Sequence, residues 1–441
     1  MSTLDRLFKE MQDLGRVSGH RDPNTPLALL GLLFFDQRLG IDSGKCELST
    51  SDDILRLARD VEFSMGWNER PFSRYLLSHI QALSPAIVAK WLSLAEGISL
   101  DAEFKNWFPN QFENLTLSTF QETPPSVAHL ITSLFEGRDV RVLDPACGTG
   151  TLLSAALKRF GAEHSSLIGK EGNGYSYSWA TIRLAAQGAG NATIELEQVL
   201  RPRNHPLNVE KQGFDIILTN PPFGVQMQVA DLPPLIRQSE LLSGKPLSGR
   251  ESARVASESA YVAMAYESLS SKGTAALIVP NGFLTRGGAD RRIREALIER
   301  EAVSAVIGLP PRLFAPITAI ETSILVLAKP SGPNAHPSTL FIDARESGYR
   351  KGAKAVLNET TVDHIIDVYK ARRSEREFSR VVSTSELLTA NSSLAPAIYF
   401  EHVAIEKVGA LDRRSKIGEL ESQYTSLRAE YEQIVLQLKR G

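Results

Sequence analysis

The middle of the chain contains short apolar runs that lack the alternation expected of a strand with one exposed face. Ile216-Ile217-Leu218 and Ala276-Leu277-Ile278-Val279 are clear examples, and stretches with helical spacing separate such runs. Strands that are hydrophobic on both faces are typical of parallel sheets covered by helices on each side. The pattern therefore predicts an α/β protein with a doubly wound, Rossmann-like sheet. We expect seven strands, at 140–146, 166–171, 193–199, 214–220, 274–280, 303–309 and 322–328.

The rest of the chain differs in pattern from this region. Residues 1–115 have helical spacing interrupted by prolines and predict an N-terminal helical domain. We place the sheet domain at 116–335 and its C-terminal extension at 336–400, with one more strand at 339–343 followed by charged helices. Residues 401–441 predict a helical tail.

The tail carries apolar residues at alternating intervals of three and four. They are Ile417, Leu420, Tyr424, Leu427, Tyr431, Ile434 and Leu438. This a/d pattern, about three heptads long, favours a coiled coil with a partner helix. An amphipathic helix that packs on its own domain would show the same pattern and is the alternative.

The composition excludes several classes of protein. The 441 residues are 42% hydrophobic and 23% charged, as in globular proteins. The 49 Lys and Arg against 51 Asp and Glu exclude a wholly basic surface, although not a local basic cleft. Cys46 and Cys147 form no disulfide framework, and no spacing predicts a metal site. Without a signal-peptide pattern or an apolar run long enough for a membrane, we expect a cytoplasmic protein.

A glycine-rich turn, Asp144-Pro-Ala-Cys-Gly-Thr-Gly-Thr151, follows the first expected strand and opens a helix. Gly148 and Gly150 allow the backbone to approach a ligand closely, at the sheet edge where doubly wound sheets bind ligands. Asp144 can accept a hydrogen bond from a bound amine there. The turn lacks the third glycine of a dinucleotide site and the lysine of a phosphate loop. A tight strand–helix turn without a ligand is the alternative.

A second motif, Asn220-Pro221-Pro222-Phe223, follows the fourth expected strand. The prolines fix the backbone and remove N–H donors, so carbonyl groups can face a cleft. The Asn220 amide oxygen and the Pro221 carbonyl suit the two hydrogens of an exocyclic amine, and Phe223 suits the ring that carries it. Because asparagine is no base near neutral pH, we expect it to orient and polarise the amine. A simple strand-ending turn is the alternative.

Both motifs fall at one edge of the predicted sheet, and together they resemble the N6-adenine DNA methyltransferases. More narrowly, the sequence resembles the modification subunit of type I restriction–modification systems. The further segments that carry this resemblance are Leu29–Phe35, Phe120–Pro125, Lys272–Leu284, Ala305–Phe314, Glu321–Leu327 and Phe341–Ala344. The resemblance implies a methyltransferase sheet of seven strands and S-adenosylmethionine as the cofactor.

The resemblance also implies roles for individual residues. The cofactor-binding residues would be Thr123, Asp144, Ala146, Gly148, Gly150, Thr151, Glu171 and Gln198, and the catalytic residues would be Asn220, Pro221, Pro222 and Phe223. Glu171 would bind the ribose hydroxyls, with a solvated acid at a strand end as the alternative, and Thr123 would lie beside the cofactor carboxylate.

The chain departs from the family at two of these positions. Gln198 stands where the family has the acid that contacts the cofactor's adenine, with Glu197 as a candidate substitute. Gln121-Glu122 replaces the usual aromatic pair before Thr123. Both changes concern the strength of cofactor binding more than the chemistry.

These features predict methyl transfer from S-adenosylmethionine to the N6 of an adenine that is flipped out of double-stranded DNA. A methylase of RNA bases or of protein glutamine is one alternative, and a scaffold that has lost cofactor binding is the other. Candidate DNA-facing segments are Gly224–Ser252 and the group Arg286, Arg291, Arg292 and Arg294, for which a plain solvated face is equally expected.

No segment has the pattern of a dedicated sequence-reading domain. The resemblance implies that a separate specificity subunit reads the DNA, and residues 415–441 could pack on its helices. A second copy of the chain and a restriction subunit are further implied partners, and a membrane is not.

Overall fold

The computed structural model describes residues 2–18, 22–41, 48–96, 100, 102–114, 122–161, 165–201, 213–243, 254–315, 318–352 and 354–400. Residues 1–395 form one compact unit and residues 396–441 a second. In the second unit the described part is the helix α16 (Pro396–Phe400). The predicted heptad tail, 401–441, and with it the expected partner helix, lies outside the described residues.

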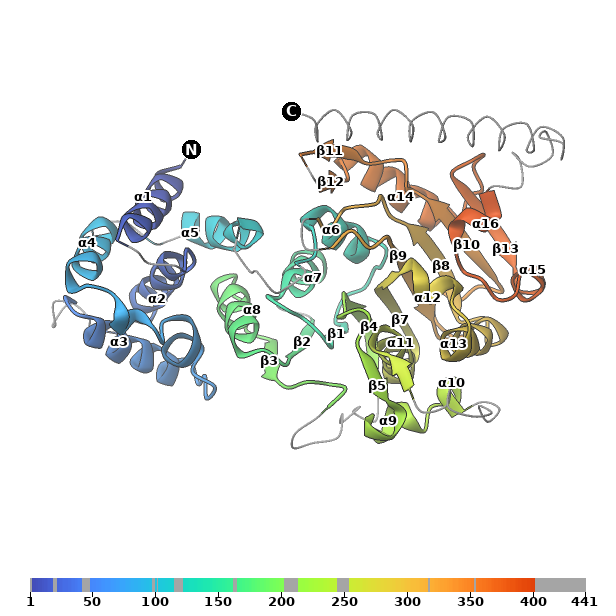
Figure 1. The fold of residues 1–441 in the computed structure, drawn as a ribbon, viewed down its shortest axis with the longest axis horizontal. Helices are drawn as coiled ribbons and strands as arrows, with labels where there is room; N and C mark the ends of the chain where they lie inside the picture. The colour runs from blue at the N-terminus through green and yellow to red at the C-terminus, as the bar shows by residue number, and fades with distance from the viewer. Residues whose placement is uncertain are drawn as a thin grey trace, which may run out of the picture. The chain divides into compact units, whose positions relative to one another are not determined.

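The first unit is built on a nine-stranded sheet with the order β13-β10-β8-β9-β7-β4-β1-β2-β3 (Figure 1). The strands are β1 (Arg141–Asp144), β2 (Ser166–Glu171), β3 (Ala192–Leu196), β4 (Phe214–Thr219), β7 (Leu269–Pro280), β8 (Val303–Gly308), β9 (Thr322–Ala328), β10 (Ser338–Asp343) and β13 (Ser379–Ser383). From β3 to β7 all neighbours are parallel, and β9 lies antiparallel between β7 and β8. The predicted α/β sheet is confirmed.

The expected count of seven strands is wrong, because two more join the sheet. The strand predicted at 339–343 is β10, which pairs in parallel with β8. The strand β13 was not predicted, and it pairs antiparallel with β10 at the edge of the sheet. Its sequence, Ser-Arg-Val-Val-Ser, gives little signal because an edge strand needs few apolar residues: Val382 is fully buried, whereas Val381 is 37% exposed.

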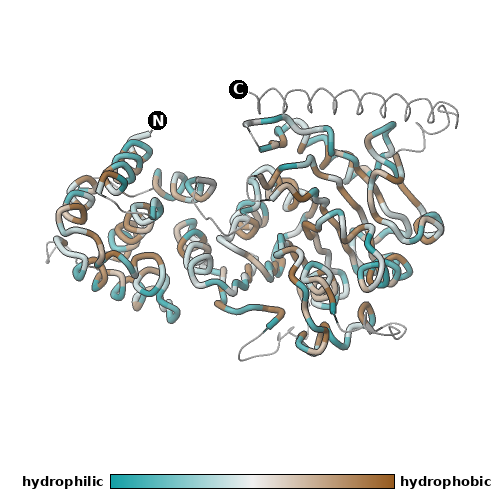
Figure 2. Tube along the Cα trace, in the orientation of Figure 1, coloured by the Kyte–Doolittle hydropathy of each residue, from teal (hydrophilic) through white to brown (hydrophobic). Residues whose placement is uncertain are grey.

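Helices cover both faces of the sheet, and Figure 2 shows hydrophobic stretches along its strands. The helices that accompany the sheet are α6 (Pro125–Ser133), α7 (Thr151–Phe160), α8 (Gly174–Ala186), α11 (Ser257–Ser268), α12 (Asn281–Thr285), α13 (Gly288–Glu299), α14 (Glu359–Ala371) and α15 (Thr384–Thr389). One core cluster joins α6, α7 and α14 to side chains of β4, β7 and β8. No described helix is long and apolar enough to cross a bilayer.

The described residues before 115 are helical, as expected. They form α1 (Thr3–Val17), α2 (Thr25–Leu39), α3 (Ser51–Ser64), η2 (Pro71–Leu76), η3 (Ile80–Ala82), α4 (Pro85–Ala95), α5 (Ala102–Trp107) and η4 (Phe108–Asn114). Capping boxes begin α1 at Ser2 and α3 at Thr50, which explains where these helices start. Their hydrophobic core continues onto α8 through Trp179 and Ile182, so α8 packs against both the sheet and the N-terminal helices. The domain boundaries at 115 and 335 stay predictions.

Short elements complete the unit. They are β5 (Gln226–Gln228), η5 (Val229–Asp231), α9 (Pro234–Arg237), α10 (Glu240–Ser243), β6 (Arg254–Ala256), β11 (Tyr349–Lys351) and β12 (Lys354–Val356). The antiparallel pair β5–β6 brackets most of the expected DNA-facing segment, of which residues 244–252 lie outside the described residues.

Candidate active site

A cavity of about 510 Å³ lies where β1, β2 and β4 end. Its lining consists of Glu122, Thr123, Asp144, Pro145, Ala146, Cys147, Gly148, Thr149, Thr151, Leu152, Lys170, Glu171, Gly172, Asn173, Glu197, Gln198, Val199, Asn220, Pro221, Pro222, Phe223 and Tyr261. Every predicted site residue except Gly150 is in this set. The parallel strand order explains the convergence, because the carboxyl ends of neighbouring parallel strands meet at one edge of a sheet.

Asn220 and Thr123 meet in this cavity from distant parts of the chain. The Asn220 side-chain nitrogen Nδ2 donates a hydrogen bond to Thr123 Oγ1 at 3.2 Å. Thr123 is buried just before α6, and Asn220 directly follows the buried strand β4. Because Thr123 holds the nitrogen of the Asn220 amide, the direction of the amide oxygen is also set.

Asp144 is the most deeply buried acid of the site, with 1% of its surface exposed. Its Oδ1 accepts a hydrogen bond from the Ala146 backbone N–H at 3.1 Å. Burial raises the pKa of Asp144 to about 7, because the charged form loses its hydration, and the nearby Glu171 adds to the shift. The carboxyl group therefore titrates near neutral pH, and a bound cation would favour its charged form.

Glu171 ends β2 and braces the glycine-rich turn. Its Oε2 accepts a hydrogen bond from the Gly148 N–H at 3.0 Å, and its Oε1 accepts one from the Asn173 N–H at 2.7 Å. Burial raises the pKa of this carboxyl group, and the backbone hydrogen bonds oppose that shift. Glu171 is thus a fixed acid on the cavity wall rather than a solvated acid at a strand end.

The two glycines of the turn have different surroundings. Both have positive φ, +56° at Gly148 and +80° at Gly150. Gly148 lines the cavity, and apart from its own residue and its two chain neighbours no described atom lies within 4 Å of the place that a Cβ would take there. At Gly150 a Cβ would lie 3.3 Å from the Cα of Ala180, so this glycine allows α7 to approach α8. The structure places Gly150 outside the cavity.

Glu122, which departs from the family pattern and was not predicted to line the site, belongs to it. It accepts hydrogen bonds from the hydroxyl groups of Thr149, at 2.7 Å, and of Thr151. The buried Arg183 on α8 lies 3.4 Å from the Glu122 carboxylate and 2.7 Å from the Thr151 hydroxyl. The Arg183 guanidinium also stacks on the Phe112 ring at 4.5 Å. Thr151, a predicted cofactor contact, is thus tied into an ionic network at the cavity wall.

Tyr261 and Cys147 are among the lining residues that were not predicted. Tyr261 on α11 is buried, and burial raises the pKa of its phenol well above the ordinary value. Burial likewise raises the pKa of the Cys147 thiol well above its ordinary value, so the thiolate is disfavoured. Tyr261 lies inside a helix and carries no motif signal, whereas Cys147 lies within the glycine-rich turn without having been assigned a role.

A family model described as N-6 DNA methylase matches residues 119–408. This range is more than half of the chain and contains every residue that lines the cavity. The chain belongs to the N-6 DNA methylase family. The resemblance inferred from the two motifs is confirmed.

Curated relatives agree with this family. The type I restriction enzyme MpnII methylase subunit of Mycoplasma pneumoniae is 26% identical over 330 residues, which are 72% of this chain and 60% of the relative. The MjaVII methylase subunit of Methanocaldococcus jannaschii is 27% identical over 312 residues, which are 67% of this chain and 52% of the relative. The chain thus spans between half and two thirds of the length of these two methylases.

The crystal structure of the type I restriction-modification system methyltransferase subunit from Streptococcus thermophilus has the same fold. The TM-score is 0.69 at 19% identity, and the match covers 90% of this chain and 99% of the other. The fold of this methylase-family chain is therefore a methyltransferase fold.

Gln198, where the chain departs from the family pattern, lies at the wall of the cavity. Gln198 is exposed and lines the cavity, as the predicted position requires. Glu197, the candidate substitute, also lines the cavity, but its carboxylate pairs with Lys170 Nζ at 2.8 Å. Lys170 in turn pairs with Glu195 at 2.5 Å. An acid is therefore present next to Gln198, held in an ion pair.

The basic group expected to face DNA is largely engaged within the protein. Arg294 is 1% exposed and donates hydrogen bonds to the carbonyl oxygens of Phe283 and Ser392. Arg286 forms ion pairs with the buried acids Glu258 and Asp290, and Arg291 forms one with Glu295. The expectation of a DNA-facing group is wrong for the buried Arg294, because charge alone in a sequence does not reveal burial.

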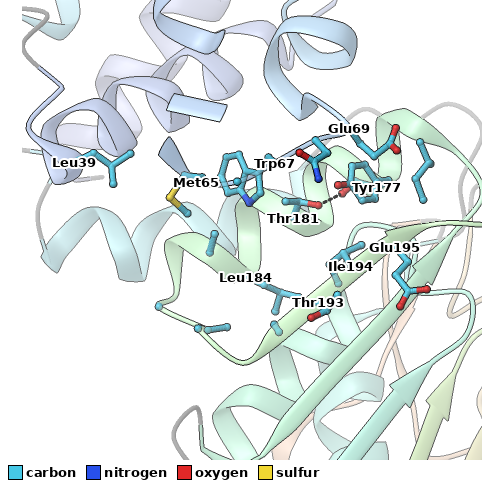
Figure 3. Close-up of a pocket in the computed structure, with 18 of the residues that line it drawn as sticks. Leu39, Met65, Trp67, Glu69, Tyr177, Thr181, Leu184, Thr193, Ile194 and Glu195 are labelled. Carbon is cyan, nitrogen blue, oxygen red and sulfur yellow. Dashed lines mark hydrogen bonds between the residues drawn. The ribbon is translucent and has the colours of Figure 1, made fainter. Parts of the chain in front are cut away.

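A second cavity, of about 750 Å³, lies between the N-terminal helices and the edge of the sheet (Figure 3). Met65 and Trp67 line it from one side, and Tyr177, Leu184 and Ile194 line it from α8 and β3. It contains none of the predicted site residues. The smaller cavity, which combines both motifs of the methylase family, is the candidate active site.

Proposed function

We propose that this chain transfers a methyl group from S-adenosylmethionine to the N6 of an adenine flipped out of double-stranded DNA. The observation that supports this most strongly is the meeting of two sets of residues in one cavity. Asp144, Gly148 and Glu171 come from the strands that would hold the cofactor, and the Asn220–Phe223 segment comes from the strand that would hold the base.

The residues present suit S-adenosylmethionine. A volume of about 510 Å³ is typical of small-molecule sites. The carboxylates of Asp144 and Glu171 on the lining favour a ligand that carries positive charge, and the open space beside Gly148 leaves the backbone accessible. When bound, the cofactor supplies an electrophilic methyl group.

The protein's own task is to orient the amine. With its nitrogen engaged by Thr123, the Asn220 amide can direct its oxygen toward one hydrogen of the adenine N6 group. The Pro221 carbonyl is the expected acceptor of the second hydrogen, and Phe223 would stack on the base. Accepting both hydrogens concentrates the nitrogen lone pair for attack on the methyl carbon, and the surplus proton then leaves to water.

We further propose that the chain is the modification subunit of a type I restriction–modification complex. The matched relatives are methylase subunits of type I restriction enzymes by name, and the net charge of −2 gives this chain no general affinity for DNA. A specificity subunit would then bind through residues 415–441, and a second copy and a restriction subunit would complete the complex. Deletion of 415–441 is expected to abolish binding of the specificity subunit in co-purification, and an unchanged complex would contradict this role for the tail.

Methyl transfer tests the central proposal. The full chain, alone and with its specificity subunit, would be incubated with S-adenosylmethionine and unmethylated genomic DNA, and N6-methyladenine would be quantified by mass spectrometry after digestion. The Asn220→Ala variant is the control and should give no product while it still binds the cofactor in calorimetry. Methyl groups recovered in RNA or protein would favour the other substrate classes, and absence of cofactor binding by the wild-type chain would favour a scaffold.

A further inference from the structure

The Asn-Pro-Pro-Phe segment needs support from outside its own strand. It leaves the sheet after β4, and its two prolines have no N–H with which to continue a ladder. The segment then turns at Gly224, whose φ is +75°. The position of its second half, which contains Phe223, therefore depends on contacts made by other elements.

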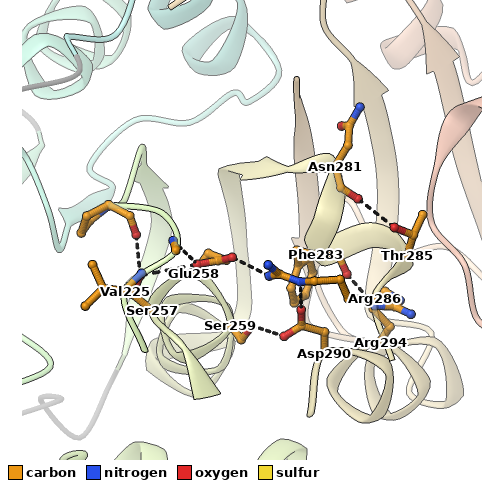
Figure 4. A network of polar contacts seen from close by, with 12 residues as sticks. Val225, Ser257, Glu258, Ser259, Asn281, Phe283, Thr285, Arg286, Asp290 and Arg294 are labelled. Atoms are coloured by element: carbon orange, nitrogen blue, oxygen red, sulfur yellow. Dashed lines mark hydrogen bonds and ion pairs between the residues drawn. The ribbon is translucent and has the colours of Figure 1, made fainter. Parts of the chain in front are cut away.

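The N-terminus of α11 supplies these contacts (Figure 4). Ser257 Oγ donates a hydrogen bond to the Pro222 carbonyl at 2.8 Å and accepts one from the Val225 N–H at 3.3 Å. The Ser257 N–H donates to the Val225 carbonyl at 2.8 Å. Glu258 Oε2 accepts a hydrogen bond from the Gly224 N–H at 2.9 Å. Two consecutive residues of α11 thus bind the segment on both sides of its turn.

The Glu258 carboxylate needs a positively charged partner, because its side chain is fully buried. Arg286, at the end of α12, provides it: Nη2 lies 2.5 Å from Glu258 Oε1. The Nε of the same guanidinium lies 2.7 Å from Asp290 Oδ2, and Asp290 also accepts a hydrogen bond from Ser259. One arginine therefore fixes two buried carboxylates, and one of them holds the catalytic segment.

We propose that Ser257, Glu258 and Arg286 are positioning residues that hold the Asn-Pro-Pro-Phe segment in its working geometry. This inference rests on the proposed function for its catalytic consequence. Arg286 orients Glu258, Glu258 fixes Gly224, and Gly224 sets the place of the Phe223 ring beside the cavity. The cofactor side of the cavity stands on β1 and β2 and does not depend on these contacts. Loss of the contacts made by Ser257, Glu258 and Arg286 should therefore impair binding and orientation of the base and leave cofactor affinity intact.

The test compares three variants of the full chain. Arg286→Met leaves Glu258 without its positively charged partner. Ser257→Ala removes the hydrogen bonds of the Ser257 hydroxyl to Pro222 and Val225 and leaves no buried charge unpaired. Arg300→Met is the matched control, because Arg300 pairs with an exposed acid, Glu240, at 2.7 Å. The second variant keeps the test valid if the first one fails to fold.

Hydrogen exchange at the amides of Gly224 and Val225, measured by mass spectrometry of the peptide that contains them, is the first readout and requires no enzymatic activity. We expect exchange to speed up about tenfold in the Arg286 and Ser257 variants, the factor that corresponds to loss of one hydrogen bond, and to stay unchanged in the control. Unchanged exchange in Ser257→Ala would overturn the proposal.

Calorimetry and steady-state kinetics complete the test. The dissociation constant for S-adenosylmethionine should stay within about twofold of wild type while kcat for DNA methylation falls about tenfold or more. A parallel loss of cofactor affinity would show a general structural role and overturn the positioning role. If the wild-type chain, assayed together with its specificity subunit, transfers no methyl group to DNA, the proposed function fails, and the exchange result still decides whether Ser257, Glu258 and Arg286 hold the segment.

Discussion

Replacement of Asp144 by asparagine should stabilise the ligand-free fold, and more so as the pH rises. Burial raises the pKa of this carboxyl group from 3.8 to about 7. Between these two values the folded chain keeps a proton that the unfolded chain has lost, so the contribution of Asp144 to stability falls as the pH increases through this window. An asparagine has no proton to lose and keeps the hydrogen-bond acceptor for the Ala146 N–H.

The expected magnitude follows from the two pKa values. One pH unit corresponds to about 1.4 kcal/mol, so the ionised Asp144 costs the fold about 4 kcal/mol at pH values above 7. Near pH 4 the carboxyl group of the folded state is neutral and this cost is absent. The free energy of unfolding of Asp144→Asn relative to wild type should therefore rise by up to about 4 kcal/mol between pH 4 and pH 8.

Urea unfolding at pH 4, 5, 6, 7 and 8, followed by circular dichroism, measures this difference directly. Asp60→Asn serves as the matched control, because Asp60 is exposed on α3. The control shows what removal of one exposed carboxylate does to the free energy of unfolding over the same range. If the Asp144 variant shows a constant offset from wild type, the carboxyl group is ionised in the fold throughout and the burial argument is wrong.

Three further outcomes follow from the same geometry. S-adenosylmethionine should bind wild-type protein more tightly at pH 8 than at pH 6 in calorimetry, since a cationic ligand favours ionised Asp144, and a flat profile would contradict this. Gly150→Ala should lower the free energy of unfolding by about 1–3 kcal/mol through its positive φ and the contact with Ala180, whereas an unchanged urea midpoint would exclude that strain. Phe223→Ala should weaken binding of a flipped base by about 1–3 kcal/mol in DNA-binding assays while cofactor affinity stays constant, and equal losses of both would argue against stacking.

Much of the candidate site was predictable because its residues are tied to the ends of parallel strands. Asp144 ends β1, Glu171 ends β2 and Asn220 follows β4, and strand order alone brings these ends together. The local chemistry of glycine and proline marks where each chain segment must leave the sheet. No knowledge of distant packing is needed for either step.

The features that were missed depend on contacts between distant parts of the chain. Gly148 and Gly150 look alike in sequence, and only the approach of Ala180 separates a cavity glycine from a packing glycine. Arg294 looks like its neighbours on α13, but its partners include the Ser392 carbonyl, 98 residues away. Local charge and spacing carry no information about such partners. The same reason explains the missed edge strand β13, whose pairing with β10 decides its structure.

Glu122 shows why a departure from a family pattern is best judged in the folded protein. In sequence it is an acid in place of an aromatic residue, which predicts weaker cofactor binding. In the fold it accepts hydrogen bonds from Thr149 and Thr151 and faces Arg183, whose guanidinium lies over Phe112. An apolar wall is thus replaced by a buried ionic network that fixes the hydroxyl groups of the glycine-rich turn. Because breaking a buried ion pair leaves an uncompensated charge, Glu122 and Arg183 depend on each other, and a change at either one reaches the cavity through Thr151.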